Sequence, residues 1–184
     1  MNLTQKAKEI LADFLKETPS PLAVDATCGN GHDTLFLAQN VGAAGRVFAF
    51  DIQKAAVESA RRLLRENSLL DRVEIFEAPH EFLKEKIPPR HFGKINAAMF
   101  NLGWLPKSDK KIITKPESTI AALKALEEII DRSKNLITVL AYPAHKGGRR
   151  EFDEVKGFIS KFSPEIFADE SNPASPALFV FKIG

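Results

Sequence analysis

The sequence contains a single cysteine, Cys28, among its 184 residues. One thiol cannot form an internal disulfide, and it cannot build a metal site that needs several cysteines. We interpret Cys28 as a small buried hydrophobic side chain, and we expect no bound metal.

Long apolar runs are also absent. No segment approaches the roughly 18 consecutive apolar residues that cross a bilayer, so no membrane partner is expected. Residues 1–6 lack the charged-then-apolar layout of a signal peptide, and there is no internal repeat or Gly/Ser linker. The length suits one domain spanning residues 1–184, and we expect a cytoplasmic protein.

A strong charge of either sign is missing as well. The chain has 26 basic and 24 acidic residues, a net charge of +2, with ordinary hydrophobic (44%) and charged (27%) fractions. This total does not by itself imply a nucleic-acid partner, because the positions of the basic residues matter more than their sum.

What the sequence does have is an alternation of helical and strand-like apolar patterns. The strand-like segments are apolar on both faces, which predicts an α/β fold with a parallel sheet covered on two sides. Ligands of such sheets bind beyond the carboxyl ends of the strands, where the polar motifs below fall. Helices are expected at residues 4–16, 33–39, 54–67, 118–132 and 151–162, and strands at residues 22–25, 46–51, 73–76, 95–100, 136–142 and 178–182.

The loop after the first expected strand has the features of a nucleotide-type site. Gly29 and Gly31 allow a tight turn and close approach of a ligand, and Asp51 follows 20 residues later, where an acid can hold a ribose. Thr34 replaces the third glycine of a dinucleotide fingerprint, and Asp25 suits an ammonium better than a pyrophosphate. These features favour S-adenosylmethionine over NAD. The alternative is a tight turn that binds nothing.

Three segments together resemble a known family. Residues 25–38 resemble motif I of class I methyltransferases, and residues 101–106 and 142–148 narrow the resemblance to the YtqB-like rRNA methylase family. Its members of assigned activity are tRNA methyltransferases of the MnmM type, which convert 5-aminomethyl-2-thiouridine at the wobble position (34) to 5-methylaminomethyl-2-thiouridine. The resemblance implies a Rossmann-like fold, with a mostly parallel seven-stranded sheet, helices on both faces and an antiparallel last strand.

The resemblance also implies S-adenosylmethionine as cofactor and places it on the sheet. The loop after the first strand would lie along the methionine part, the acid after the second strand would hold the ribose, and the residues after the third would border the adenine or ribose. The implied cofactor site comprises Asp25, Thr27, Gly29, Asn30, Gly31, His32, Asp33, Thr34, Asp51, Gln53, Pro79 and His80.

Catalysis is expected at the end of the fourth strand, at Asn101. A primary amine attacks a methyl group only when neutral, and the protein must mainly align the reactants. The side-chain oxygen of Asn101 can accept an N–H of that amine, with His80 or His145 as candidate proton acceptors. The structural alternative is that Asn101 caps a turn, since the residues of Asn-Leu-Gly favour turns.

Basic residues gather after the fourth and fifth strands, on the predicted side of the site, and would neutralise phosphates of a tRNA anticodon loop. Ordinary solvated loop charges are the alternative. Without a separate RNA-binding module, the catalytic domain must supply the contacts, and a homodimer would enlarge its surface. The expected substrate-binding residues are Trp104, Pro106, Lys110, Lys111, Tyr142, His145 and Arg149; Lys107, Lys115, Lys146 and Arg150 extend the basic groups.

Three positions depart from the family pattern: Trp104 replaces a usual tyrosine, Lys107-Ser108 a glycine pair, and Ala144 a glycine. The departures bear on the substrate more than on the cofactor. A methyltransferase for another RNA site or for a small molecule therefore stays open, as does a non-catalytic protein that binds the cofactor or a nucleotide. A dehydrogenase is disfavoured by Thr34.

Overall fold

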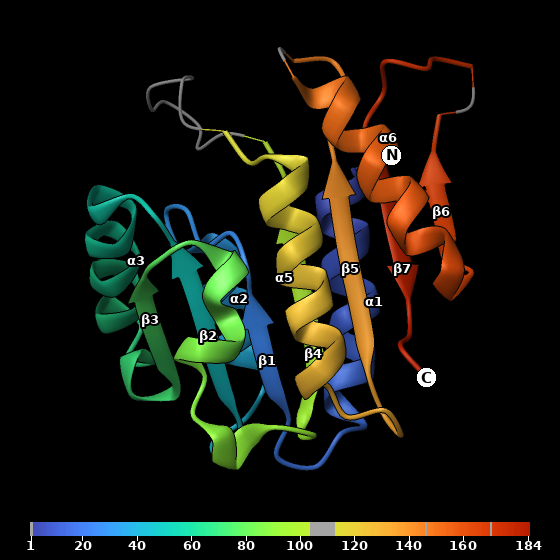
Figure 1. Ribbon diagram of the computed structural model, residues 1–184. Helices are drawn as coiled ribbons and strands as arrows, with labels where there is room; N and C mark the ends of the chain where they lie inside the picture. The colour runs from blue at the N-terminus through green and yellow to red at the C-terminus, as the bar shows by residue number, and fades with distance from the viewer. Residues whose placement is uncertain (1, 104–112, 146, 170) are drawn as a thin grey trace.

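The computed structural model describes residues 2–103, 113–145, 147–169 and 171–184. Its centre is a seven-stranded sheet in the order β3-β2-β1-β4-β5-β7-β6 (Figure 1), with β7 antiparallel to both of its neighbours. The strands are β1 (Leu22–Asp25), β2 (Arg46–Asp51), β3 (Val73–Glu77), β4 (Ile95–Asn101), β5 (Leu136–Ala141), β6 (Glu165–Ala168) and β7 (Ala177–Phe181). This is the α/β arrangement expected from the sequence.

The strand order reverses between β1 and β4. From β1 the chain builds outward through β2 to β3, and then returns to place β4 on the other side of β1. Loops leaving β1 and β4 therefore diverge in opposite directions and open a crevice at the carboxyl edge of the sheet. This is the edge at which the polar motifs of the sequence were expected.

Helices cover both faces of the sheet (Figure 1). Residues of α1, α2 and α3 join one hydrophobic cluster with the sheet, and residues of α4, α5 and α6 join the other. The helices are α1 (Leu3–Lys16), α2 (His32–Asn40), α3 (Lys54–Glu66), α4 (Leu83–Lys86), α5 (Pro116–Ile129) and α6 (Gly148–Ile159). No helix within the described ranges is both long and apolar enough to span a membrane.

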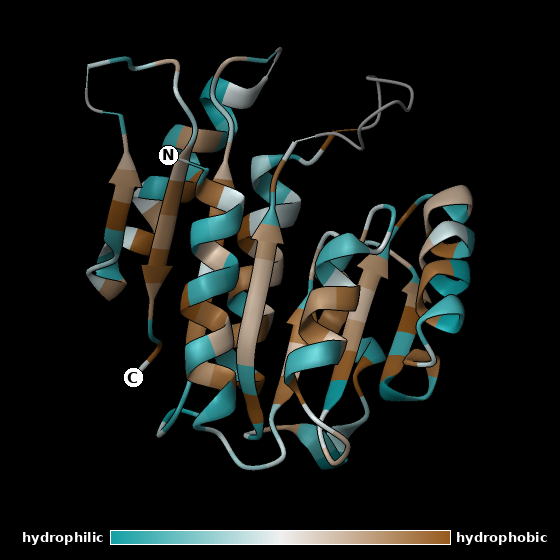
Figure 2. Ribbon diagram, turned by 180° about the vertical axis from the view of Figure 1, so that it is seen from behind, coloured by the Kyte–Doolittle hydropathy of each residue, from teal (hydrophilic) through white to brown (hydrophobic). Residues whose placement is uncertain are grey.

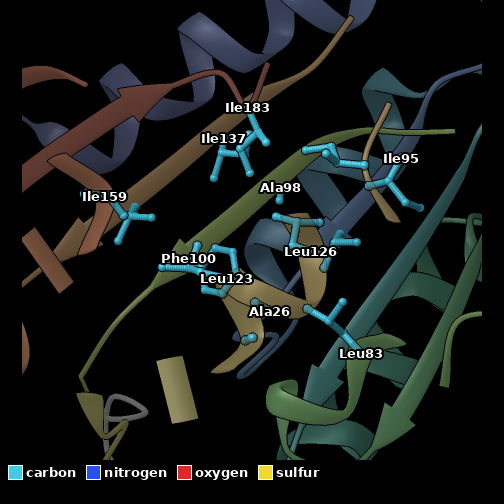
Figure 3. Packing of buried hydrophobic residues seen from close by; sticks show 14 of the residues in the cluster. Ala26, Leu83, Ile95, Ala98, Phe100, Leu123, Leu126, Ile137, Ile159 and Ile183 are labelled. Carbon is cyan, nitrogen blue, oxygen red and sulfur yellow. The ribbon is translucent and has the colours of Figure 1, made fainter. Parts of the chain in front are cut away.

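Alternation along β4 divides the core. Ala98 and Phe100 face the cluster that contains α5, whereas Ala97 and Met99 face the cluster that contains α1, because successive side chains of a strand point to opposite faces. Figure 3 shows Phe100 beside Leu123 of α5, and Figure 2 shows hydrophobic strands behind helices whose outer sides are polar. Apolar packing on both faces holds the strand ends, and hence the crevice, in place.

All six expected strands are confirmed with small shifts at their ends, but β6 was not predicted as a strand from its own residues. It is a four-residue edge strand whose side chains are mostly exposed, although three of the four are apolar. Helix α5 starts two residues before the expected position, with Pro116 in its first turn, where a missing N–H costs nothing. Helix α6 also starts earlier, at Gly148, and its last expected residues form a 3₁₀ turn.

We expect Gly31→Ala to destabilise the fold more than Gly42→Ala. Both glycines have left-handed φ angles, +88° and +71°. A Cβ at Gly31 would lie 2.7 Å from Cα of Ala60 in α3, whereas a Cβ at Gly42 would meet nothing within 4 Å. Both variants place an alanine in a strained left-handed conformation, but only Gly31→Ala also brings its Cβ into overlap with Ala60. Gly31→Ala should therefore lose about 1–3 kcal/mol more unfolding free energy than Gly42→Ala. Urea denaturation measures both, and equal losses would contradict the packing role of Gly31.

Candidate functional site

A cavity of about 700 Å³ opens at the carboxyl edge of the sheet, where β1, β2 and β4 end. Its size lies within the usual range of ligand pockets, and its place is the reversal of strand order. The loop after β1 forms part of the wall, together with residues 51–53 at the end of β2, residues 78–81 after β3 and residues 101–103 at the end of β4. The cavity therefore joins the motifs that the sequence analysis singled out separately.

The loop after β1 is tied to both neighbouring strands. The backbone N–H of Cys28 donates to the carbonyl of Phe50 in β2 (2.9 Å). On the other side, the backbone N–H of Asn101 in β4 donates to Oγ1 of Thr27 (2.8 Å). Gly29 has a φ of +53°, a left-handed conformation that glycine adopts at little cost. These bonds fix the path of the loop across the sheet end.

The carboxylate of Asp51 is held by two backbone N–H groups. Gly29 donates to Oδ2 (2.9 Å) and Gln53 donates to Oδ1 (2.8 Å). Each carboxylate oxygen keeps a further lone pair, and the residue lines the cavity. Asp51 can therefore accept hydrogen bonds from a pair of vicinal hydroxyls, as its expected ribose role requires.

Asp25, Gly31 and Thr34 are not among the residues that line the cavity, whereas the other nine expected cofactor residues are. Asp25 is fully buried and accepts bonds from Oγ1 of Thr34 (2.6 Å) and the N–H of Thr27 (3.1 Å). Burial, together with the nearby charge of Asp33, raises the pKa of Asp25 to about 7. These three residues shape the loop, so the geometry favours a supporting role over the direct cofactor contacts that we expected.

Asp25 should make stability depend on pH. Its pKa is raised in the folded protein from 3.8 to about 7, so its stabilising contribution is complete below about pH 4 and is lost as pH rises through 7. Asp25→Asn has no such titration. Between pH 4 and 8 the wild type should therefore lose up to roughly 4 kcal/mol of unfolding free energy relative to the variant. Urea denaturation of both proteins across this pH range tests the prediction. A difference in unfolding free energy that does not change with pH would contradict it.

At the end of β4, the side chain of Asn101 is oriented by Asp33. Its amide nitrogen Nδ2 donates to Oδ2 of Asp33 (3.3 Å), and Oδ1 of Asp33 pairs with Nζ of Lys8 from α1 (2.7 Å). All three residues line the cavity. Its nitrogen is engaged and no described residue donates to its oxygen Oδ1, so Asn101 offers the acceptor that its expected role requires.

His80, which also lines the cavity, presents a second hydrogen-bond acceptor. The ring is buried, and Nδ1 lies 3.0 Å from the carbonyl oxygen of Ala26, to which it must donate. Burial lowers the pKa of His80 and so favours the neutral ring. Nε2 is also buried, and no described residue forms a hydrogen bond with it. A ligand N–H or O–H donor in the cavity can satisfy it.

The structure separates the expected substrate residues. Tyr142 lines the cavity, and burial raises its pKa. His145 is not among the lining residues, because its ring packs against Gly148, where a Cβ would lie only 2.6 Å from Nε2. Arg149 is also outside the lining; its Nε donates to Asp153 (2.8 Å) within α6. The expected residues Trp104, Pro106, Lys110 and Lys111, with Lys107, Ser108 and Lys146, lie outside the described residues.

The contribution of α1 to the cavity was not predicted from the sequence. Thr4 and Lys8 lie one helical turn apart and both line it, next to the apolar stripe that packs α1 on the sheet. Their spacing of four was the available signal, but it did not show what they face. Ile52 and Ser118 are further lining residues that were not predicted. Over the described ranges, no group of three or more His, Cys, Asp or Glu side chains is placed to hold a metal.

Comparisons with known proteins agree with this architecture. The family described as "Putative rRNA methylase" matches residues 47–170. The chain is 37% identical over 173 residues to the tRNA (mnm(5)s(2)U34)-methyltransferase, chloroplastic, of Arabidopsis thaliana, covering 86% of this chain and 62% of the relative. It thus spans less than two thirds of that relative's length. A match to ribosomal RNA small subunit methyltransferase H of Oceanobacillus iheyensis is shorter, 29% identical over 85 residues, 46% of this chain and 26% of the relative.

Two solved structures extend the similarity over the whole chain. A "putative rRNA-methylase" from Clostridium thermocellum has a TM-score of 0.89 and 34% identity, covering 99% of this chain and 97% of the other. A "putative methyltransferase" from Streptococcus mutans in complex with SAH has a TM-score of 0.82 and 26% identity, covering 99% of this chain and 98% of the other. The sheet is therefore the Rossmann-like methyltransferase fold that the resemblance implied. The family match covers well over half of the sequence, and the chain belongs to the "Putative rRNA methylase" family.

Proposed function

We propose that this protein is an S-adenosylmethionine-dependent methyltransferase that acts on RNA. Its proposed reaction is N-methylation of 5-aminomethyl-2-thiouridine at wobble position 34 of tRNA, which gives 5-methylaminomethyl-2-thiouridine. The observation that carries the proposal is the amide oxygen of Asn101, left as an acceptor in the same cavity as the ribose-type carboxylate of Asp51. The name of the Arabidopsis relative, which specifies this nucleoside, supports it.

The cavity suits S-adenosylmethionine on its own chemistry. Asp51 offers two oriented carboxylate oxygens for the ribose hydroxyls, and the unpartnered Nε2 of His80 can accept a hydrogen bond from the nucleoside part. The backbone at Gly29 approaches the cavity without a Cβ, and Asn30 and His32 line the part expected to hold the methionine moiety. The SAH bound by the Streptococcus mutans relative is the demethylated product of this cofactor. When bound, the cofactor supplies a methyl group activated by its positively charged sulfur.

The chain's own residues then have to bind and orient the substrate amine. The amine must arrive neutral, with its lone pair free. Asn101 Oδ1 accepts one amine N–H and so fixes the direction of the lone pair. A proton leaves the nitrogen after it gains the methyl group, and it passes to water. The neutral ring of His80 is the alternative acceptor, provided that its Nε2 is not bonded to the nucleoside part of the cofactor. His145, which does not line the cavity, is a weaker candidate for that step.

Contacts with the tRNA anticodon loop belong to the same proposal. Lys115 lines the cavity beside the start of α5 and can meet a phosphate. Arg149 and Arg150 are exposed but engaged in ion pairs with Asp153 and Glu154. Exposed pairs of this kind contribute little stability, so phosphates can replace the carboxylates. A cytoplasmic location and a homodimer remain predictions, the second testable by sedimentation.

The test is methyl transfer from labelled S-adenosylmethionine to tRNA that lacks 5-methylaminomethyl-2-thiouridine, followed by nucleoside analysis. Label in that nucleoside is the expected result. Ribosomal RNA, offered in parallel, tests the activity that the family description suggests. Label in rRNA alone, or none in tRNA despite tight cofactor binding, would overturn the wobble-uridine assignment.

A further inference from the structure

Lys8 of α1 is joined to the reacting end of the cavity through one carboxylate. Its ammonium lies 2.7 Å from Oδ1 of Asp33, and the other oxygen of Asp33 accepts the Nδ2 hydrogen bond of Asn101 at 3.3 Å. The three side chains come from the first helix, the second helix and the fourth strand. A residue far from the strand ends in sequence is thereby connected to the proposed methyl acceptor site.

We propose that Lys8 is a positioning residue for methyl transfer, which acts through Asp33 to keep the amide oxygen of Asn101 directed at the substrate amine. The amide group of an asparagine can rotate so that its oxygen and nitrogen exchange positions. Only the orientation with Nδ2 on Asp33 leaves an acceptor for the amine, whereas the reverse would present a donor to it. This inference rests on the proposed function.

Burial gives the Lys8–Asp33 pair more weight than an ordinary surface ion pair. The side chains of Lys8 and Asp33 are only 21% and 13% exposed, so salt and water screen them incompletely. The backbone of Lys8 is also held in place, because Ala7 and Leu11 of the same helix are buried in the core. The ammonium lies 5.6 Å from the centre of the Phe36 ring, a further favourable contact.

The charge of Lys8 is needed because acids crowd this part of the molecule. The charges of Asp33 and Asp51 both contribute to the raised pKa of Asp25. Of the described lining residues, only Lys8 and Lys115 are lysine or arginine, and only Lys8 pairs with Asp33. Removing the ammonium would leave Asp33 facing like charges without compensation, and its hold on Asn101 would loosen.

The first experiment reads the network without any reaction. The side-chain amide signals of Asn101 in ¹⁵N-labelled protein are assigned by their absence in Asn101→Ala. Lys8→Met should shift them and Lys8→Arg should restore them. Lys16→Met removes a mostly exposed lysine from the end of the same helix, and it should leave them unchanged. Unshifted Asn101 signals in Lys8→Met would overturn the proposal, whether or not the protein methylates tRNA.

The second experiment measures turnover with tRNA and the Kd of S-adenosylhomocysteine. Lys8→Met should lower kcat about 10-fold with unchanged Kd, as expected for a lost charge-assisted hydrogen bond. In an Asn101→Ala background it should have no further effect, because Lys8 acts through that residue. An equal loss of kcat in both backgrounds, or weakened product binding with unchanged kcat, would overturn the proposal. A wild-type protein inactive on tRNA would instead refute the proposed function, while the amide signals still decide the role of Lys8.

Discussion

Replacing Asp51 with asparagine should weaken the binding of S-adenosylhomocysteine about 10- to 100-fold. Two backbone N–H groups, those of Gly29 and Gln53, donate to the two oxygens of the native carboxylate. An asparagine has one oxygen, so in either orientation its NH₂ group faces one of these donors. A hydrogen bond to a charged group contributes about 1.5–3 kcal/mol, and the loss of one such bond to the ribose corresponds to this weakening. The bond lost to the backbone is absent from the free variant as well, so it affects the loop more than the affinity. Isothermal titration calorimetry measures the affinity.

Glu77→Gln is the matched control for this substitution. Glu77 pairs with Asp51 in the register of β3 with β2, ends its own strand, and is exposed outside the cavity lining. It undergoes the same change from carboxylate to amide and should leave the affinity unchanged. If Asp51→Asn bound the product as tightly as the wild type, the ribose role would be wrong, and Asp51 would serve only to shape the loop. Circular dichroism of both variants checks that the fold is kept.

Asp51 could be placed at the cavity from the sequence because its evidence is local. A strand, a glycine loop, a helix and a second strand follow one another without interruption, and parallel strands bring their carboxyl ends to one edge. The same logic placed Asn101 correctly at the cavity, since β4 pairs with β1. Lys8 has no such local signal. Its contact with Asp33 depends on how α1 packs across the sheet, which helical periodicity alone does not specify.

The sequence also could not tell which side of a loop faces a ligand. Asp25, Gly31 and Thr34 lie among residues that line the cavity, yet their side chains or Cα atoms face the core and α3. A buried threonine and a buried carboxylate that bond each other look in sequence like two free polar groups. Strand β6 was missed for another reason: it is a four-residue edge strand that the backbone ladder to β7 defines, and so short an apolar run does not by itself indicate a strand.

Asn101→Ala should lower kcat for methyl transfer to tRNA about 100-fold, with the affinity for S-adenosylhomocysteine unchanged. The substitution removes the acceptor Oδ1 that orients the amine, and a misaligned nucleophile costs roughly this factor. It leaves the strand end in place, because the bond to Oγ1 of Thr27 comes from the backbone N–H of residue 101. Single-turnover kinetics and calorimetry measure the two quantities.

Asn67→Ala is the matched control for this loss. Asn67 lies at the exposed end of α3, where its amide donates to the carbonyl of Leu63, and it is not among the residues that line the cavity. Its kcat should equal that of the wild type. A fall in kcat without a change in product affinity identifies an interaction made at the reacting atoms rather than in cofactor binding. Full turnover by Asn101→Ala would instead mean that Asn101 only ends β4, and that the amine is oriented by another acceptor in the cavity.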